Sequence, residues 1–210
     1  MKFLDLTFST PEENLACDEA SLDACEAGQN EEVLRFWESP SYFIVLGYSN
    51  KAETEVNLEA CKHGGVPVLR RSSGGGTVLQ GPGCLNYSLV LKIQHSADCA
   101  TITGANAFIM KKHRDALQKL LGREVTIAGH TDLALGLLKF SGNAQRRKRN
   151  FFLFHGTFLL DFDLAMMEKF LALPSREPDY RQKRSHLDFL TNLNVPADAI
   201  KSVLKTVWKV

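Results

Sequence analysis

Short apolar runs rich in β-branched and aromatic residues dominate the middle of the chain and predict a series of strands. These runs cover residues 33–37, 42–46, 66–70, 77–79, 85–93, 124–127, 132–135, 137–140 and 151–160. The last run is apolar at most positions, which is typical of a strand that is buried on both faces.

Helical patterns lie between these groups of strands. Thr10, Pro11 and Glu13 have the order of an N-cap, a first-turn proline and a capping box, and predict a helix that ends before Gly28. Further helices are expected over residues 105–121, 164–173 and 196–209, and a surface loop over residues 175–185. Because regular βαβ alternation is missing, the pattern predicts an α+β fold with a mixed or largely antiparallel sheet, in a single domain over residues 1–210.

The composition excludes several classes of protein. Among 210 residues, Lys and Arg total 25 and Asp and Glu total 24, which leaves a formal net charge of +1. This balance gives no general attraction to nucleic acid or to an anionic membrane. The hydrophobic fraction of 44% and the charged fraction of 23% are ordinary for a globular protein and argue against disorder.

The cysteines and the N-terminus indicate the compartment. The five cysteines are odd in number and never form a C-x-x-C pair, so we expect free thiols in a reducing environment and neither a disulfide framework nor a zinc site. The N-terminus lacks the pattern of a signal peptide, and the longest apolar runs are too short to span a membrane. A cytoplasmic protein without nucleic-acid or membrane partners is therefore expected.

Residues 70–76 have the sequence Arg-Arg-Ser-Ser-Gly-Gly-Gly and are expected to form a loop, because three consecutive glycines favour neither helix nor strand. The glycines let backbone N–H groups approach a ligand, and Arg70 and Arg71 add positive charge that suits phosphate or carboxylate groups. The segment matches neither G-x-G-x-x-G nor G-x-x-x-x-G-K-[ST]. A flexible hairpin loop with a solvated arginine pair explains the composition equally well.

Two further segments place polar residues beside apolar strands. Lys139 lies at the edge of an apolar run, where a lysine can stabilise charge on a transferring acyl or phosphoryl group, although a single lysine is usually a surface residue. His155, Gly156 and Thr157 interrupt a very hydrophobic strand, where polar groups need partners or a function. A hydrogen-bonded core histidine is the simpler alternative.

These motifs resemble those of the lipoate–protein ligase A group in the biotin/lipoate ligase superfamily. The segments that match, in family order, are residues 70–78, 83–88, 139–144 and 155–160, with similarity also at residues 14–20, 33–37 and 45–47. Each is weak alone, but four in register make a chance match improbable. The resemblance implies a catalytic domain similar to those of class II tRNA synthetases and biotin ligases, which agrees with the α+β prediction.

The same resemblance implies a lipoate–protein ligase or lipoyltransferase. Members of the family join lipoate to ATP with release of pyrophosphate, and then pass the lipoyl group from lipoyl-adenylate to one lysine of a lipoyl domain or H-protein-type acceptor. The expected ligands are therefore ATP with Mg²⁺, and lipoate as substrate. The sequence has no side-chain motif for direct binding of the metal.

The resemblance also assigns site residues by their positions in the motifs. Lys139 is the expected catalytic residue, Asn86 is expected near the phosphates or Mg²⁺, and Asp132 near the adenine. The rest of the expected acyl-adenylate site consists of Arg70, Arg71, Ser73, Gly74, Gly75, Gly76, Thr77, Gly142, His155, Gly156 and Thr157. Attack of a carboxylate on phosphorus brings two anions together, so cations are needed there. The apolar strands are expected to form a tunnel for a C8 acyl chain, in which each buried CH₂ contributes ~0.8 kcal/mol.

Two departures from the family pattern bear on the reaction. The better-known ligases carry an accessory domain after the catalytic domain, whereas this chain ends at Val210, so either a separate accessory subunit or transfer of a pre-activated lipoyl group is expected. Related octanoyltransferases use a cysteine thioester, but all five cysteines here precede Lys139, the closest being Cys99. Cys84, near the glycine loop, is the one thiol worth testing for reactivity.

Three functions stay open from the sequence: a lipoate–protein ligase or lipoyltransferase, an ATP-independent octanoyltransferase, and a non-catalytic protein that binds an acyl acid. Biotin ligation is less favoured by the form of the glycine loop. The basic run at residues 146–149 is either a solvated loop or a surface that attracts an acidic lipoyl domain or ATP. All three functions require the glycine loop and Lys139 to face one pocket.

Overall fold

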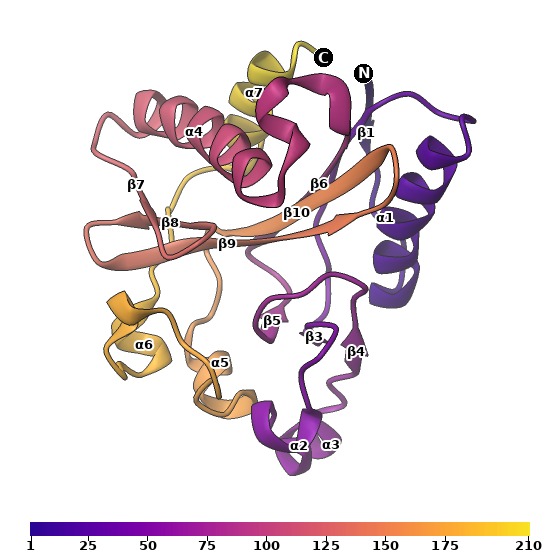
Figure 1. Cartoon of the computed structure of the whole chain (residues 1–210). Helices are drawn as coiled ribbons and strands as arrows, with labels where there is room; N and C mark the ends of the chain where they lie inside the picture. Colours follow the sequence, from indigo (N-terminus) through magenta and orange to yellow (C-terminus); the bar gives the residue numbers. More distant parts are fainter.

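A seven-stranded sheet forms the centre of the molecule, and the computed structural model describes it together with all other parts of residues 1–210 (Figure 1). In spatial order its strands are β1 (Lys2–Asp5), β2 (Val33–Trp37), β6 (Cys84–Lys92), β10 (Phe151–Leu159), β9 (Leu138–Arg147), β8 (Asp132–Leu135) and β7 (Thr126–Ala128). Strands β1 and β2 are parallel, and every other neighbouring pair is antiparallel.

A second sheet has three strands, β4 (Val68–Arg70), β3 (Phe43–Leu46) and β5 (Val78–Gln80). Strand β3 is parallel to β4 and antiparallel to β5. The helices are α1 (Pro11–Glu26), α2 (Ala52–Glu55), α3 (Leu58–Gly64), α4 (Ile102–Leu121), α5 (Ala165–Phe170), α6 (His186–Phe189) and α7 (Ala197–Trp208). The prediction of an α+β fold with a mixed, largely antiparallel sheet is confirmed. No helix combines the length and the apolar character that crossing a membrane requires.

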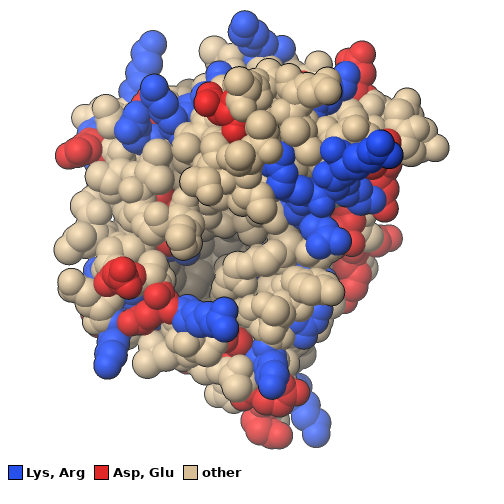
Figure 2. Space-filling model, viewed as in Figure 1, with Lys and Arg blue, Asp and Glu red and all other residues tan.

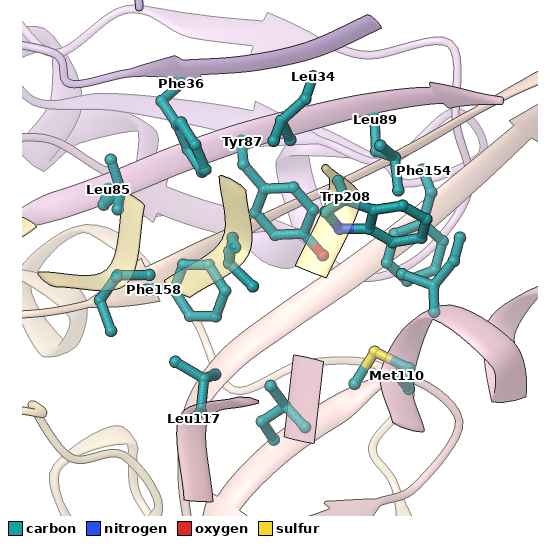
Figure 3. Packing of buried hydrophobic residues seen from close by; sticks show 14 of the residues in the cluster. Leu34, Phe36, Leu85, Tyr87, Leu89, Met110, Leu117, Phe154, Phe158 and Trp208 are labelled. Carbon is teal, nitrogen blue, oxygen red and sulfur yellow. The ribbon is translucent and has the colours of Figure 1, made fainter. Parts of the chain in front are cut away.

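The central sheet has two different faces, because successive side chains of a strand point to opposite sides. On one face, Tyr87, Phe154 and Phe158 belong to the largest hydrophobic cluster, which also contains Met110 of α4 and Trp208 of α7 (Figure 3). Helices α4 and α7 lie together on this side of the sheet (Figure 1). This face is therefore the main hydrophobic core.

The opposite face is divided. Helix α1 covers one part of it, where Leu22 and Cys25 pack against Val90 and Leu153 in a smaller cluster. The capping box predicted for this helix is present, since the Thr10 side chain accepts a hydrogen bond from the backbone N–H of Glu13. Beyond α1, the same face carries polar side chains and is covered by the three-stranded sheet and the chain that follows β10.

Strand β9 differs most from the prediction. A short strand over residues 137–140 was expected, but β9 continues to Arg147 and pairs with β10 over Ser141–Arg147. The polar and small residues of β9 do not alternate with apolar ones, because neither face of this strand is uniformly apolar or uniformly exposed to solvent. The sequence therefore showed no strand pattern there. The basic run at residues 146–149 is correspondingly divided between the strand and the turn that follows.

Several other boundaries differ. Helix α4 begins at Ile102, because Thr101 caps it and Gly104 lies within its first turn. Gly104 is needed there because a Cβ atom would lie 2.2 Å from the Asp98 carbonyl oxygen. Helix α5 is shorter than expected, and residues 175–185 are not merely a surface loop, since they contain a 3₁₀ turn in which Arg181 is buried. Strand β1 and helices α2, α3 and α6 were not predicted.

Replacement of Tyr87 by Phe tests the link between the core and the polar groups of β9. The buried Tyr87 hydroxyl donates a 2.6 Å hydrogen bond to Asn143 Oδ1. Its removal leaves the half-buried Asn143 oxygen without its partner, so we expect the free energy of unfolding to fall by ~1 kcal/mol in urea denaturation. Tyr48 is 65% exposed, and Tyr48→Phe is the matched control, with an expected change below ~0.5 kcal/mol. Equal effects of the two substitutions would contradict the assignment.

Candidate active site

A cavity of about 860 Å³ lies between the polar part of the central sheet, the three-stranded sheet and the chain after β10. Figure 2 shows its mouth as a hollow with charged side chains of both signs along the rim. Lys139 and Gly75 both line this cavity, although they are far apart in the sequence. The structure therefore brings the glycine loop and the lysine to one space.

Most of the residues singled out in the sequence meet in this cavity. Those that line it are Arg71, Gly75, Gly76, Thr77, Asn86, Asp132, Lys139, Gly142, His155, Gly156 and Thr157. Arg70, Ser73 and Gly74 do not line it. They make hydrogen bonds that hold the glycine loop and the neighbouring chain in place.

Arg70 holds the neighbouring chain in place. Its Nη1 atom donates to three backbone carbonyl oxygens, those of Gly47, Tyr48 and Asn50, at 2.8–2.9 Å. Carbonyl oxygens are good partners for a guanidinium group, so this geometry is a stable one. The sequence suggested that Arg70 binds an anion in the pocket, but the structure directs its side chain to the backbone.

Arg71 shapes the glycine loop from inside. Its Nη2 atom donates to the carbonyl oxygens of Gly74 and Gly76, each at 2.7 Å, and its Nε atom donates to Ser73 Oγ at 3.0 Å. The side chain is buried, and burial lowers the pKa of Arg71 to about 10, so the group stays charged at neutral pH. The arginine holds the loop carbonyls toward its guanidinium group and adds positive charge to the cavity wall.

Two glycines of this region are required by close packing. Gly75 has a φ of +89°, which L side chains rarely adopt. Its carbonyl oxygen lies 2.1 Å from the position that a Cβ atom of Gly47 would occupy, so Gly47 has to be glycine as well. Added Cβ atoms at Gly74 and Gly76 would meet nothing within 4 Å. The loop therefore leaves open space on its exposed side.

Ser73 connects the glycine loop to β10. Its Oγ atom lies 2.6 Å from His155 Nε2 and accepts a hydrogen bond from Arg71. The serine oxygen has a second lone pair and one proton, so this bond forms with either tautomer of the neutral ring. Burial and the nearby Arg71 charge lower the pKa of His155 to about 3. His155 is therefore a neutral hydrogen-bonding residue and not a base for reactions at neutral pH.

Lys139 pairs with a carboxylate inside the cavity. Its Nζ atom lies 2.9 Å from Asp132 Oδ1, and the Tyr180 hydroxyl donates to Asp132 Oδ2 at 2.8 Å. Burial and the Asp132 charge raise the pKa of Tyr180, which keeps the phenol protonated as the donor. Both oxygens of Asp132 are thus engaged by protein groups, and its position near adenine, which the resemblance implies, stays a prediction.

Gly142 makes room for the lysine. A Cβ atom at this position would lie 2.8 Å from Lys139 Nζ and 2.9 Å from its Cε atom. Gly142 is paired with Asp132 across β8 and β9 and with Thr157 across β9 and β10. The lysine therefore lies flat over the sheet and directs its ammonium group along the cavity floor.

Part of the cavity lining is apolar. It includes Leu15 of α1, Trp37 of β2, Val45 of β3, Val78 of β5 and Met167 of α5. Burial of a hydrocarbon chain against such side chains contributes ~25 cal/mol per Å². The cavity thus combines the ammonium group of Lys139 with apolar surface.

The site includes residues that sequence reasoning missed. Trp37, Gln80, Asn143 and Tyr180 were not singled out. Trp37 and Gln80 lie in runs that predict strands, so only the register shows that they face the cavity. Tyr180 lies in a segment expected to be a surface loop, and its contact with Asp132 joins residues far apart in the chain. Asn143 alone carried a signal, as a polar residue within the Lys139 motif.

None of the five cysteines lines the cavity. Cys84 is fully buried in the second hydrophobic cluster, and burial raises the pKa of its thiol to about 12. Because the thiolate is the nucleophilic form, Cys84 is a packing residue. No group of three or more His, Cys, Asp or Glu side chains is placed to hold a metal ion.

The basic run at residues 146–149 is not a single patch. The Arg147 guanidinium donates to the carbonyl oxygens of Cys99 and Ala100, and Lys148 pairs with Asp23. Arg146 and Arg149 are exposed. Basic side chains at the end of the β9–β10 hairpin are visible in Figure 2 away from the hollow. An interaction of this surface with an acidic partner stays a prediction.

Comparison with known proteins identifies the family. The lipoyl protein ligase A/B catalytic domain matches residues 10–205. The chain belongs to this family. A protein of Aeropyrum pernix with an inferred assignment as lipoate-protein ligase A is 32% identical over 171 residues. The match covers 81% of this chain and 61% of that protein.

The family members that are similar to this chain have different activities. The octanoyltransferase LipM of Geobacillus kaustophilus is 27% identical, over 95% of this chain and 82% of that protein. A solved structure of lipoate-protein ligase A bound with ATP is 25% identical and has a TM-score of 0.82, with 99% of this chain and 83% of that chain covered. The family is thus an enzyme family of lipoate ligases and transferases, and the resemblance found in the sequence is confirmed.

The pH dependence of stability tests the state of His155. Its pKa is about 3 in the folded protein and ~6.5 when unfolded, so below pH 6.5 the unfolded chain takes up a proton that the folded protein refuses. Stability is therefore lost as the pH falls, and His155 accounts for a loss of ~2 kcal/mol between pH 7 and pH 5. In urea denaturation at the two pH values, His155→Gln should lose that much less than the wild type. The same loss in both proteins would show that His155 is protonated when folded.

Proposed function

We propose that this chain is an ATP-dependent lipoate–protein ligase. It activates lipoate as lipoyl-adenylate and transfers the lipoyl group to the lysine of a lipoyl domain. The observation that carries the proposal is the single cavity that brings Lys139, the glycine loop and apolar side chains together, without a thiol among its lining residues.

Activation joins two anionic groups. A carboxylate oxygen of lipoate attacks the α-phosphorus of ATP, a C(O)–O–P bond forms, the bond between the α- and β-phosphates breaks, and pyrophosphate leaves. Lys139 Nζ stabilises the charge on the carboxylate and phosphoryl oxygens, and Arg71 adds positive charge to the cavity wall at the loop. The open backbone at Gly76, which lines the cavity, gives the phosphates close access to the loop.

ATP carries Mg²⁺ through its phosphate oxygens, as Mg²⁺ commonly binds in nucleotide sites. The residues present fit a metal ion held by ATP and not by the protein. Asp132, the carboxylate that contacts Lys139, already has its two oxygens engaged by Lys139 and Tyr180. In the second step the acceptor amine attacks the acyl carbonyl carbon, an amide bond forms, AMP leaves and the amine proton goes to solvent. The apolar wall limits hydrolysis of the mixed anhydride in the meantime.

An octanoyltransferase is the second candidate, favoured by the relatives of that name. The sequence comparison ties that reaction to a cysteine thioester. The absence of cysteine from the cavity lining and the raised pKa of Cys84 count against it. A ligase needs no protein nucleophile, because the acceptor lysine attacks the adenylate directly.

Incubation with an apo lipoyl domain tests the proposal. With lipoate, ATP and Mg²⁺, the chain should release pyrophosphate and increase the mass of the acceptor by one lipoyl group. Lys139→Ala should lower the rate by at least ~100-fold, and the exposed lysine variant Lys111→Ala is the control with wild-type rate.

The other outcomes separate the alternatives. Modification with synthetic lipoyl-adenylate but not with ATP would replace the ligase by a lipoyltransferase that needs an activating partner. Transfer from octanoyl carrier protein without ATP would indicate an octanoyltransferase. Binding of lipoate with neither reaction would indicate a binding protein.

Gly142→Ala tests the position of the lysine. The new methyl group would displace Lys139 Nζ by about 1 Å, a misplacement that can cost ~100-fold in rate. We expect such a loss in kcat for acceptor modification, with little change in melting temperature. Ala144→Gly, two residues along the same strand face, removes a methyl group and leaves the lysine in place. If the two variants have equal rates, Gly142 is not needed for the lysine.

A further inference from the structure

Two residues next to Asp132 and Gly142 bond to each other through their side chains. Thr131 Oγ1 donates to the Asn143 carbonyl oxygen at 2.7 Å, and Asn143 Nδ2 donates to the Thr131 carbonyl oxygen at 2.6 Å. Asp132 and Gly142 form the last pair in the ladder between β8 and β9, so this reciprocal contact lies at the following position. It continues the pairing of the two strands with side-chain donors, and we call it the Thr131–Asn143 clasp.

The clasp has one possible orientation. The Asn143 side chain lies on the core face of the sheet, where its Oδ1 atom accepts a hydrogen bond from the Tyr87 hydroxyl. A carbonyl oxygen can only accept, so Nδ2 must be the amide atom that faces Thr131. Gly156 is the neighbour of Asn143 on β10, and a Cβ atom there would lie 1.8 Å from Asn143 Oδ1. The glycine at position 156 therefore leaves room for the asparagine side chain.

A β-bulge in β9 makes this contact important for Lys139. The register between β8 and β9 shifts after Leu133, and Phe140 is the extra residue on β9. Positions 139 and 142 would lie on opposite faces of a regular strand, because side chains alternate. The bulge turns Lys139 to the face that carries Gly142, so that the ammonium group reaches Asp132.

The clasp holds Asp132 on the side away from the bulge. Only two pairs, Asp132 with Gly142 and Leu133 with Ser141, lie in the ladder before the bulge interrupts it. Because so short a ladder gives few backbone contacts, the two side-chain bonds at the next position add to what fixes Asp132. The Asp132 carboxylate in turn lies 2.9 Å from Lys139 Nζ. A continuous series of contacts thus leads from the clasp through the carboxylate to the ammonium group.

We propose that Thr131 and Asn143 are positioning residues for Lys139. The clasp fixes the Asp132 carboxylate beside the bulge, and the carboxylate holds the ammonium group over Gly142, where it stabilises charge on the reacting oxygens. The inference rests on the proposed function, because it concerns the lysine of that reaction. A misplacement of such a group by about 1 Å can cost ~100-fold in rate, so loss of one bond of the clasp should lower kcat by about tenfold.

Thr131→Val tests the clasp, because it removes the hydroxyl and keeps the branched shape. With lipoate and ATP, we expect kcat for pyrophosphate release to fall about tenfold, while the two KM values stay near those of the wild type. Thr131→Ser keeps the hydroxyl and should restore kcat. Thr126→Val is the matched control, because Thr126 Oγ1 donates to the Ala134 carbonyl oxygen on the same strand, outside the cavity. The control should keep the wild-type kcat.

A double-mutant cycle identifies the residue through which the clasp acts. Thr131 also lines the cavity, so direct contact with a substrate has to be separated from positioning. Asp132→Asn removes the charge that holds the ammonium group. If the clasp acts through Asp132, adding Thr131→Val to this variant should lower kcat by less than about twofold. A further loss as large as in the wild-type background would overturn the inference.

NMR of the lysine ammonium groups decides the question without the reaction. In protein with isotope-labelled lysine side chains, the Lys139 signal is assigned by its loss in Lys139→Ala. An ammonium group that is held in an ion pair exchanges its protons slowly and gives a sharp signal. We expect this signal in the wild type, Thr131→Ser and Thr126→Val, and its broadening or loss in Thr131→Val and Asp132→Asn. Asn143→Ser, which shortens the side chain and breaks its bond to Thr131, takes the place of Thr131→Val if that variant does not fold.

The outcomes separate this inference from the proposed function. A Lys139 signal that is absent from the wild type, or equally sharp in Thr131→Val, would overturn the inference and leave the ligase proposal intact. If the wild type activates no acid, the proposed function fails, and the NMR result still decides whether the clasp positions the lysine.

Discussion

Side-chain alternation along three adjacent strands is the constraint on which the structure depends. In β6, β10 and β9, one set of side chains enters the core under α4 and α7, and the other set lines the cavity. A shift of one residue in any of these strands would bury the polar set and expose the apolar set. The large cluster that includes Tyr87, Phe154 and Phe158 therefore fixes the register, and the register places Asn86, Thr157 and Gly142 side by side on the cavity floor.

Glycine and arginine act together in this site, but not in the simple way that their composition indicates. Arg70 and Arg71 direct most of their donors to backbone carbonyl oxygens. They convert a flexible Gly-Gly-Gly segment into a loop of one shape, which lowers the entropy that a ligand would otherwise have to remove on binding. The arginine charge still contributes to the local potential, because Arg71 lines the cavity and stays protonated.

The position of Lys139 in the cavity depends on the missing side chain at Gly142 as well as on the groups that contact the lysine. Gly142 leaves the space in which Lys139 lies, and Asp132 with Tyr180 keeps the ammonium group over that space. None of the five cysteines lines the same cavity. The neutral state of His155 agrees with this division of roles, since its ring serves to hold the glycine loop against β10.

The sequence by itself determined the fold class, the start of α1, most of the strands, the family, and the two motifs that meet in the cavity. These follow from local patterns, such as the capping box at Thr10 and the glycine run at residues 74–76, which depend on neighbours in the chain. Only the tertiary structure decided that β9 continues through its polar residues and that Arg70 points away from the cavity. It also decided that Gln80 and Tyr180 belong to the site. The reason is physical: a side chain's partner is set by strand pairing and packing between distant segments, and single-chain periodicity carries no information about which segments meet.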